Sequence, residues 1–283
     1  MAASAARVLD AEGFNVGALR GVVVWEGRRG GRAALIRRID GRESAIPGGR
    51  RATWSDDILD TGRFTQLDLG LDARNRIVAV YRLCGLRRCG GVLVADVRSG
   101  GERRLVIPAP PRCRSFGPVA RWRTTIAATF ACRGRGRSGV YVVHGRNARL
   151  VRKLSAAQAR TGVTLDLGPD VLVGASAGEV WVASPGAPAC RTVAVPIPRS
   201  VNRVDVHATP GRAWWGFSTA ADFGGSVFQF GTAAVGPSCA VTDTRTIDTF
   251  PELDWATGTF AVDGPNIYVA GRDTGGVVTA PIE

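Results

Sequence analysis

Short apolar runs separated by turn-forming residues are the dominant pattern along this chain. Four such runs lie between residues 64 and 108, and the segments between them carry Asp, Asn and Gly. The run 77–81 is β-branched and almost wholly apolar, which is typical of a strand buried on both faces. Asn and Gly tolerate positive φ, and Asp can hydrogen-bond its own backbone. The pattern predicts four antiparallel strands joined by tight turns, and no run has helical length and period.

The same pattern returns along the rest of the chain at roughly 40–50 residues, the period of four-stranded propeller blades. The predicted units span residues 15–47, 64–108, 116–154, 163–197, 203–243 and 250–283. A lone four-stranded sheet cannot bury both faces, whereas radial stacking of sheets can. The sequence therefore predicts an all-β fold, a single domain over residues 1–283, built as a six-bladed β-propeller of four-stranded antiparallel blades. The isolated apolar run 5–9 is expected to add the outer strand of the last blade and close the ring.

The stretch 64–108 resembles the blades of TolB-type and WD-like bacterial β-propellers. It has Asp72 in the first turn, then the strand 77–80, the run 93–97 with its Ala-Asp-Val ending, and Gly100-Gly101 before the closing strand. Residues 259–272 are similar to a blade of the NHL kind. The separate N-terminal α/β domain of TolB has no counterpart in this sequence, so the resemblance implies a fold and no role in the Tol envelope machinery. Propeller blades host enzymes, sensors and scaffolds alike.

Six cysteines favour an oxidising compartment. No apolar run approaches the ~20 residues of a membrane helix, and no apolar leader follows Met1. We expect an exported protein, extracellular or in the cell envelope, whose signal segment has been removed; a cytosolic protein with buried thiols is the alternative. The predicted strands favour three disulfides, which are Cys84–Cys89, Cys113–Cys132 and Cys190–Cys239. Without a Cys-x-x-Cys pair, and with only two histidines, no metal site or other cofactor is expected.

Positive charge is concentrated in the first half of the chain. The net charge is +13, and the residues from 155 onward carry seven Arg against twelve Asp and Glu, a balance of −5, which leaves +18 on residues 1–154. The preference for Arg over Lys is typical of a GC-rich genome, but it does not explain this distribution. A basic half-surface predicts an anionic partner such as a cell-wall polymer or a phosphorylated glycan; a solvated surface that keeps the protein soluble is the alternative. Nucleic acid is not expected, because the arginines are not interleaved with aromatic residues for base stacking.

An aspartate recurs in the first strand of four predicted units. These residues are Asp68, Asp166, Asp205 and Asp254, and the third unit has Arg121 in the same place. First strands line the channel of a propeller, and strand alternation puts these side chains on one side. An acidic ring could hold a cation or supply a carboxylate pair for glycoside or lyase chemistry. Alternatively, each Asp accepts backbone N–H groups and locks neighbouring blades. Arg121 breaks the repeat and is the strongest single candidate for a ligand contact.

Other candidate sites are weaker. Ser176 lies in a Gly-x-Ser-x-Gly sequence, but between two predicted strands of a hairpin and not at the strand-to-helix elbow of serine hydrolases. His207 could pair with Asp205, two positions away, although no nucleophile accompanies the pair. His144 is expected in a rim turn. Trp54 lies in a polar connection and is a plausible sugar or peptide contact over the channel mouth.

The sequence favours an exported, monomeric binding or scaffold module without catalytic residues. It would recognise a protein, an anionic glycan or a cell-envelope polymer through a channel mouth and its basic surface. The alternative is a propeller enzyme of the glycoside hydrolase, lyase or lactonase type that uses channel carboxylates. An enzyme should have one asymmetric pocket with a strongly perturbed titratable pair, whereas a scaffold should have evenly hydrogen-bonded aspartates.

Overall fold

The structure is a computed structural model, and the elements it describes are almost all strands. It describes residues 7–11, 13–29, 32–50, 67–84, 89–134, 136–161, 163–176, 178–186, 193–196, 203–220, 226–247, 258–271 and 276–282. The single helix of these residues is α2 (Gln158–Thr161), which the sequence did not predict. Among the described residues, no helix has the length and apolar character needed to cross a lipid bilayer. The prediction of an all-β fold is confirmed.

The strands form antiparallel meanders. The first sheet contains β2 (Phe14–Leu19), β3 (Val22–Arg29), β4 (Arg32–Ile39) and β5 (Arg42–Arg50). The next meander contains β6 (Asp68–Leu71), β7 (Ile77–Cys84), β8 (Cys89–Asp96) and β9 (Gly100–Arg104). It joins β10 (Cys113–Trp122), β11 (Thr125–Cys132), β12 (Gly139–His144) and β13 (Asn147–Lys153) in one eight-stranded sheet.

The second half of the chain continues in the same way. One sheet contains β14 (Val163–Leu167), β15 (Leu172–Ser176), β16 (Glu179–Ala183) and β17 (Val193–Pro196). The next contains β18 (Arg203–Thr209), β19 (Arg212–Ala220), β20 (Ser226–Val235) and β21 (Val241–Ile247). The last contains β22 (Gly258–Asp263), β23 (Asn266–Gly271), β24 (Gly276–Pro281) and β1 (Arg7–Asp10).

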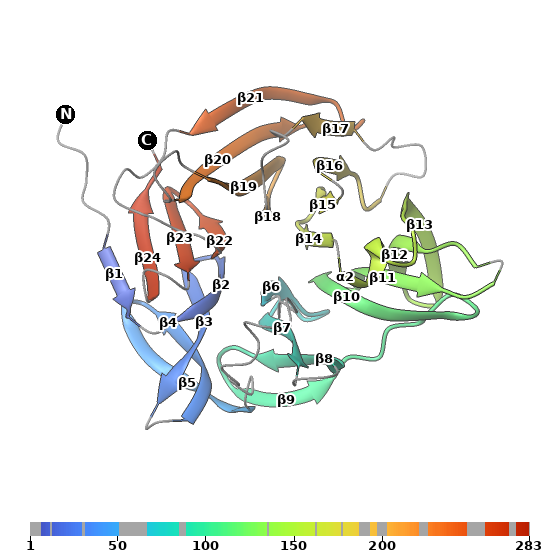
Figure 1. The fold of residues 1–283 in the computed structure, drawn as a ribbon. Helices are drawn as coiled ribbons and strands as arrows, with labels where there is room; N and C mark the ends of the chain where they lie inside the picture. Colours follow the sequence, from blue (N-terminus) through green and yellow to red (C-terminus); the bar gives the residue numbers. More distant parts are fainter. Residues whose placement is uncertain are drawn as a thin grey trace.

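The sheets stand around a central axis in a propeller-like arrangement (Figure 1). The strands β2, β6, β10, β14, β18 and β22 contact one another in this order, and β22 returns to β2. Buried apolar clusters fill the space between neighbouring sheets. In one of them Leu165 and Trp181 pack with Ala120 and Ala127 of the preceding sheet. Because each sheet buries both of its faces in this way, the near-continuous apolar runs of the sequence become interior strands.

The two ends of the chain meet in one sheet. β1 pairs antiparallel with β24, with Arg7 opposite Thr279 and Val8 opposite Val278. β1 is therefore the outer strand of the last sheet, as the sequence predicts for the run 5–9. Trp25 of β3, in the neighbouring sheet, stabilises the position of β1, because its indole Nε1 donates to Asp10 Oδ2 at 2.6 Å.

Strands β6 and β10 approach each other unusually closely. Trp122 and Leu71 form a parallel pair, and Arg123 N donates to Leu71 O at 2.8 Å. Gly70 permits this approach, because a Cβ atom there would lie 1.7 Å from the carbonyl oxygen of Arg121. The eight-stranded sheet therefore consists of two meanders joined by a short parallel contact at their inner strands.

The first and last sheets have inner strands that the sequence did not identify as inner strands. Among the described residues, the innermost strand of the last sheet is β22; the run 253–255, which the sequence marks as a first strand, lies outside the described residues. The first sheet has a further inner strand, β2, before the runs that the sequence marks as strands. Asn15 and Gly17 interrupt the apolar residues of β2, so its apolar run does not stand out.

Candidate functional site

The predicted inner-strand aspartates bind backbone amides of neighbouring sheets or meanders. Asp68 Oδ2 accepts from Arg121 N at 3.2 Å, Asp166 Oδ2 from Ala208 N at 2.8 Å, and Asp205 Oδ2 from Phe260 N at 3.1 Å. In the last sheet Thr259 takes this position, and its Oγ1 accepts from Val16 N at 2.9 Å. All four side chains are buried. The recurring bond joins four successive pairs of inner strands, which are β6–β10, β14–β18, β18–β22 and β22–β2.

One inner-strand aspartate has a further partner that the sequence did not predict. His207 Nδ1 lies 2.8 Å from Asp166 Oδ2, and His207 Nε2 lies 2.9 Å from the carbonyl oxygen of Val262. The sequence suggested Asp205 as the partner of His207; the carboxylate within hydrogen-bonding distance of Nδ1 is that of Asp166 from the neighbouring sheet, and the charge of Asp205 also raises the pKa of His207. Since both ring nitrogens face acceptors, the geometry favours a doubly protonated imidazolium.

Burial and mutual contact separate the pKa values of this cluster. Burial raises the pKa of Asp68 well above its usual value, and the negative charge of Asp166 raises it further. Burial would also raise the pKa of Asp166, but the charge of His207 and hydrogen bonds from His207 and Asp68 bring it below its usual value. Burial would lower the pKa of His207, but the charge of Asp166 raises it overall. These opposite shifts favour a shared proton on Asp68 and a negative charge on Asp166, which faces His207.

The proton linkage of this cluster gives a predicted pH dependence. The pKa of His207 is raised above 6.5, so its stabilising contribution is complete below that pH and is lost as the pH rises through the folded-state pKa. Asp68 acts in the same direction above 3.8, because the folded state holds its proton more tightly. Asp166, with its lowered pKa, acts in the opposite direction and contributes stability that is lost only in acid.

Urea unfolding should therefore show a free energy of unfolding that falls as the pH rises above 6.5. The exposed His144 provides the control, because the His144→Ala variant should keep the same slope. A free energy of unfolding that rises across this range would contradict the assigned proton positions.

The space at the axis is small. The cavity beside the inner strands measures about 10 Å³, and its lining includes Asp68, Asp166, Asp205, His207 and Thr259. A single water molecule needs roughly 10–15 Å³. In the described part of the chain, the axial polar cluster therefore has the geometry of a packed junction between sheets.

Arg121 does not line that cavity. Its backbone N–H binds Asp68, and its guanidinium Nε donates to the carbonyl oxygen of Arg123 at 2.9 Å. Its Nη1 is buried without a hydrogen-bond partner. Burial lowers the pKa of Arg121, and the positive charge of Arg103 adds to this effect. Arg121 therefore lies near the end of β10. It contacts the axial carboxylate of Asp68 through its backbone N–H and not through its guanidinium group.

The remaining predicted site residues fall in two groups. Asp254, Trp54 and Cys190 lie outside the described residues. Ser176 lies in the β15–β16 hairpin, buried, and its Oγ accepts from the indole Nε1 of Trp181 at 3.2 Å. His144 ends β12 and is exposed, as expected.

Of the three predicted disulfides, the structure describes one completely, Cys113–Cys132. Cys113 and Cys132 form a disulfide between the facing ends of β10 and β11, which confirms that pair. The strand register places Cys84 opposite Cys89, although their side chains lie outside the described set. Cys239 is disulfide-bonded.

A basic cleft of about 510 Å³ lies beside the Cys113–Cys132 disulfide. Its lining contains four arginines, which are Arg112, Arg114, Arg133 and Arg160. The sequence predicted a concentration of positive charge on residues 1–154 but not this cleft. The sequence signal for the cleft is the position of three arginines next to two cysteines: Arg112 and Arg114 flank Cys113, and Arg133 follows Cys132. Once that disulfide is predicted, these three side chains must lie close together.

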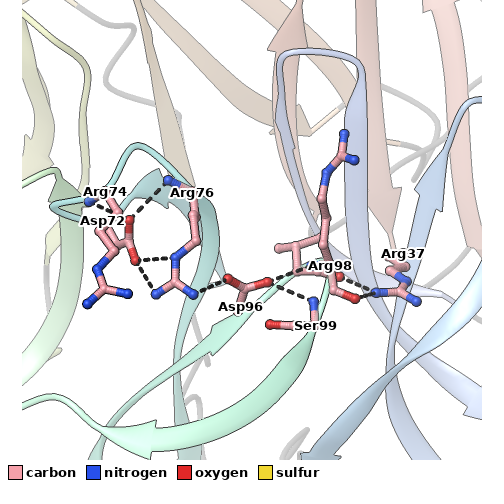
Figure 2. A network of polar contacts seen from close by, with 8 residues as sticks. Arg37, Asp72, Arg74, Arg76, Asp96, Arg98 and Ser99 are labelled. Atoms are coloured by element: carbon pink, nitrogen blue, oxygen red, sulfur yellow. Dashed lines mark hydrogen bonds and ion pairs between the residues drawn. The ribbon is translucent and has the colours of Figure 1, made fainter.

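Arginines at the opposite end of these meanders are paired with acceptors. Arg76 Nη2 lies 2.6 Å from Asp72 Oδ2, and Arg76 Nη1 lies 3.2 Å from Asp96 Oδ2; Figure 2 shows how Arg76 lies between the two carboxylates. Burial would raise the pKa of Asp72, but its hydrogen bonds from Arg76 hold it below its usual value. Arg37, from the first sheet, donates to the carbonyl oxygens of Val97 and Arg98 (Figure 2). This network connects the first sheet to the second meander. Within it, Arg76 is paired with carboxylates and Arg37 with backbone carbonyl groups.

No protein-family model matches the chain, and no curated protein matches it. Solved structures do. A fucose-specific lectin from Aleuria aurantia matches with a TM-score of 0.50 and 9% identity, over 96% of this chain and 92% of that chain. A glucose dehydrogenase matches with a TM-score of 0.55 and 10% identity, over 99% of this chain and 100% of that chain.

The chain has a propeller-like fold. The tricorn protease supports the same conclusion with a TM-score of 0.51 and 12% identity, over 97% of this chain but only 27% of that chain. At these identities the likeness shows the fold alone, since propellers of one shape support unrelated functions. The TolB type stays a prediction from the sequence.

Proposed function

We propose that this chain is a non-catalytic binding module that recognises an anionic partner through the basic surface of its first half. The observation that carries the proposal is the cleft beside the Cys113–Cys132 disulfide, with its four lining arginines. Within the described residues, no carboxylate forms an ion pair with Arg112, Arg114 or Arg133. Uncompensated guanidinium groups around a concave surface attract anions and concentrate them there.

The scaffold in this proposal is a single six-bladed propeller domain over residues 1–283. The eight-stranded sheet then counts as two blades, because its two meanders share only the parallel pair Trp122–Leu71. Contact between the six inner strands supports this count, and a fungal lectin of similar shape is described as a six-bladed β-propeller. The inner-strand aspartates have a structural role here, and the ligand binds at the rim.

The proposed partner is an anionic glycan or cell-envelope polymer outside the cytoplasm. The Cys113–Cys132 disulfide supports an oxidising location, and the guanidinium groups suit phosphate or carboxylate groups, which they bind through paired hydrogen bonds. The similar fungal lectin recognises fucose, which shows that this scaffold can present a carbohydrate site. We propose that the protein acts as a monomer.

An enzyme at the axis is less well supported. Two contacting carboxyl groups with oppositely shifted pKa values are typical of acid–base sites. However, the adjoining cavity of about 10 Å³ cannot admit a sugar ring, and the aspartates are already occupied by backbone amides.

The proposal is tested by comparing dextran sulfate with neutral dextran as ligands for the full chain at about 0.15 M salt, where surface charges are screened beyond roughly 8 Å. Titration should show saturable binding of the sulfated polymer, at least about tenfold tighter than that of the neutral one. Equal binding of the two polymers, or no binding of either, would show that the basic half-surface serves solubility only.

A further inference from the structure

The cleft beside the Cys113–Cys132 disulfide is a braced site. The disulfide links the start of β10 to the end of β11, and Arg133 N donates to Arg112 O at 3.1 Å just beyond it. Two strands and a covalent bond thus fix the backbone of the segments that carry the arginines. A site whose backbone is fixed loses little conformational entropy on binding.

The fourth arginine comes from a different segment that is also fixed. α2 begins with a reciprocal cap in which Gln158 N donates to Ser155 Oγ at 3.1 Å and Ser155 N donates to Gln158 Oε1 at 2.9 Å. Ala159 is fully buried where α2 packs against β10 and β11. An anchored turn therefore places Arg160 at the cleft, and the site joins three separate segments of the chain, residues 112–114, residues 131–134 and Arg160.

The backbone at Arg112 is in an unusual conformation. Its φ is +63°, in the left-handed region that favours glycine, within a turn closed by Cys113 N donating to Pro110 O at 3.1 Å. Strained positions of this kind often occur at functional sites. The turn places an arginine at the edge of the cleft where a glycine would be the conformationally easier residue.

The cleft is strongly basic along its described residues. Its described lining consists of four arginines, Cys113, Ala131 and Gly134, without an acidic residue. Arginines elsewhere in the first half, such as Arg38 and Arg76, are paired with carboxylates. In the described part of the chain, Arg112, Arg114 and Arg133 have no carboxylate ion-pair partner; like charges placed close together repel one another, and a bound anion would relieve that repulsion.

We propose that this cleft binds a phosphate group. The inference rests on the proposed function and narrows it from anions in general to one chemical class and one place. Each guanidinium offers up to five donors in a planar fork. A carboxylate has only two oxygens with which to accept them, whereas a phosphate monoester has three terminal oxygens and a charge of about −1.5 to −2 near neutral pH. The volume of about 510 Å³ holds a phosphate together with an attached sugar ring or glycerol unit.

The test compares a cleft variant with a charge-matched control. The cleft variant is Arg112→Gln/Arg133→Gln. The control, Arg74→Gln/Arg146→Gln, removes the same charge from two exposed turn residues at the other end of the strands. The soluble probes are inorganic phosphate, glucose 6-phosphate and glucose. The lipid probes are phosphatidylcholine vesicles with and without phosphatidic acid.

Calorimetric titration of the full chain should show that phosphate-bearing probes bind and glucose does not. The cleft variant should bind at least about tenfold more weakly, because two charge-assisted hydrogen-bonding groups are lost, while the control stays within about twofold of the parent. Binding to vesicles but not to glucose 6-phosphate would identify a lipid headgroup as the source of the phosphate. Binding to soluble probes alone would identify a free ligand.

The outcomes separate this inference from the proposed function. Equal losses in the cleft and control variants, with dextran sulfate still bound by the parent chain, would overturn the phosphate site and leave the anion-binding module standing. Failure of the parent chain to bind dextran sulfate or any phosphate probe would overturn both. If the cleft variant does not fold, as judged by circular dichroism, Arg114→Gln replaces it, since Arg114 is exposed on β10 and lines the same cleft.

Discussion

Replacement of His207 by alanine is expected to lower the free energy of unfolding by about 3–5 kcal/mol, the usual effect of removing one partner of a buried ion pair. His207 is buried at the junction of three sheets, where it contacts Asp166 at 2.8 Å and the carbonyl oxygen of Val262 at 2.9 Å. Its loss leaves the carboxylate without a counter-charge and the carbonyl without a donor. Urea unfolding at about pH 6, where the imidazolium is formed, measures the difference.

The second histidine provides the matched control for this experiment. His144 is exposed at the end of β12 and makes only a long contact of 3.4 Å with Thr125 Oγ1. The His144→Ala variant should change the free energy of unfolding by less than about 0.5 kcal/mol. Equal effects at the two histidines would mean that the axial ion pair does not hold the sheets together.

The same substitution at two neighbouring aspartates is expected to have effects of very different size. Asp166→Asn should destabilise the protein by about 3–5 kcal/mol, because it removes the negative charge facing His207. Asp68→Asn should change stability by about 1 kcal/mol or less near neutral pH. Its amide can donate to Asp166, as the protonated carboxyl does, and its oxygen can still accept from Arg121 N.

The comparison is a sensitive one because both positions are buried and the change in volume is identical. Chemical unfolding of the two single variants at one pH measures it directly. A loss of stability at Asp68→Asn as large as that at Asp166→Asn would show that Asp68 is ionised in the folded protein, and the proton arrangement at the axis would be wrong.

The strand pattern predicts much of the fold because every sheet is buried on both faces. Apolar runs such as 77–81 and 140–143 have no other stable environment. The aspartates at positions 68, 166 and 205 could be assigned to inner strands because alternation fixes their side. In the last unit the described inner strand carries Thr259 in place of an aspartate, whereas the sequence pointed to Asp254, which lies outside the described residues.

Contacts between sheets could not be predicted in the same way. The Asp166–His207 pair depends on how two neighbouring meanders are offset along the axis, and no local pattern encodes that offset. His207 therefore appeared to belong with Asp205 on its own strand. The basic cleft is an intermediate case. Its arginines are unremarkable in the sequence, but the cysteine pairing brings Arg112, Arg114 and Arg133 together.

The central claim is that the ligand binds at the rim, beside the disulfide, and that the axis only holds the sheets together. Hydrogen exchange of the full chain with and without glucose 6-phosphate tests it most directly. The account predicts slower exchange at residues 112–115 and 131–134, with exchange at the inner strands β6, β14 and β18 unchanged. Slower exchange confined to those inner strands, with residues 112–115 unaffected, would contradict it and favour a site at the axis.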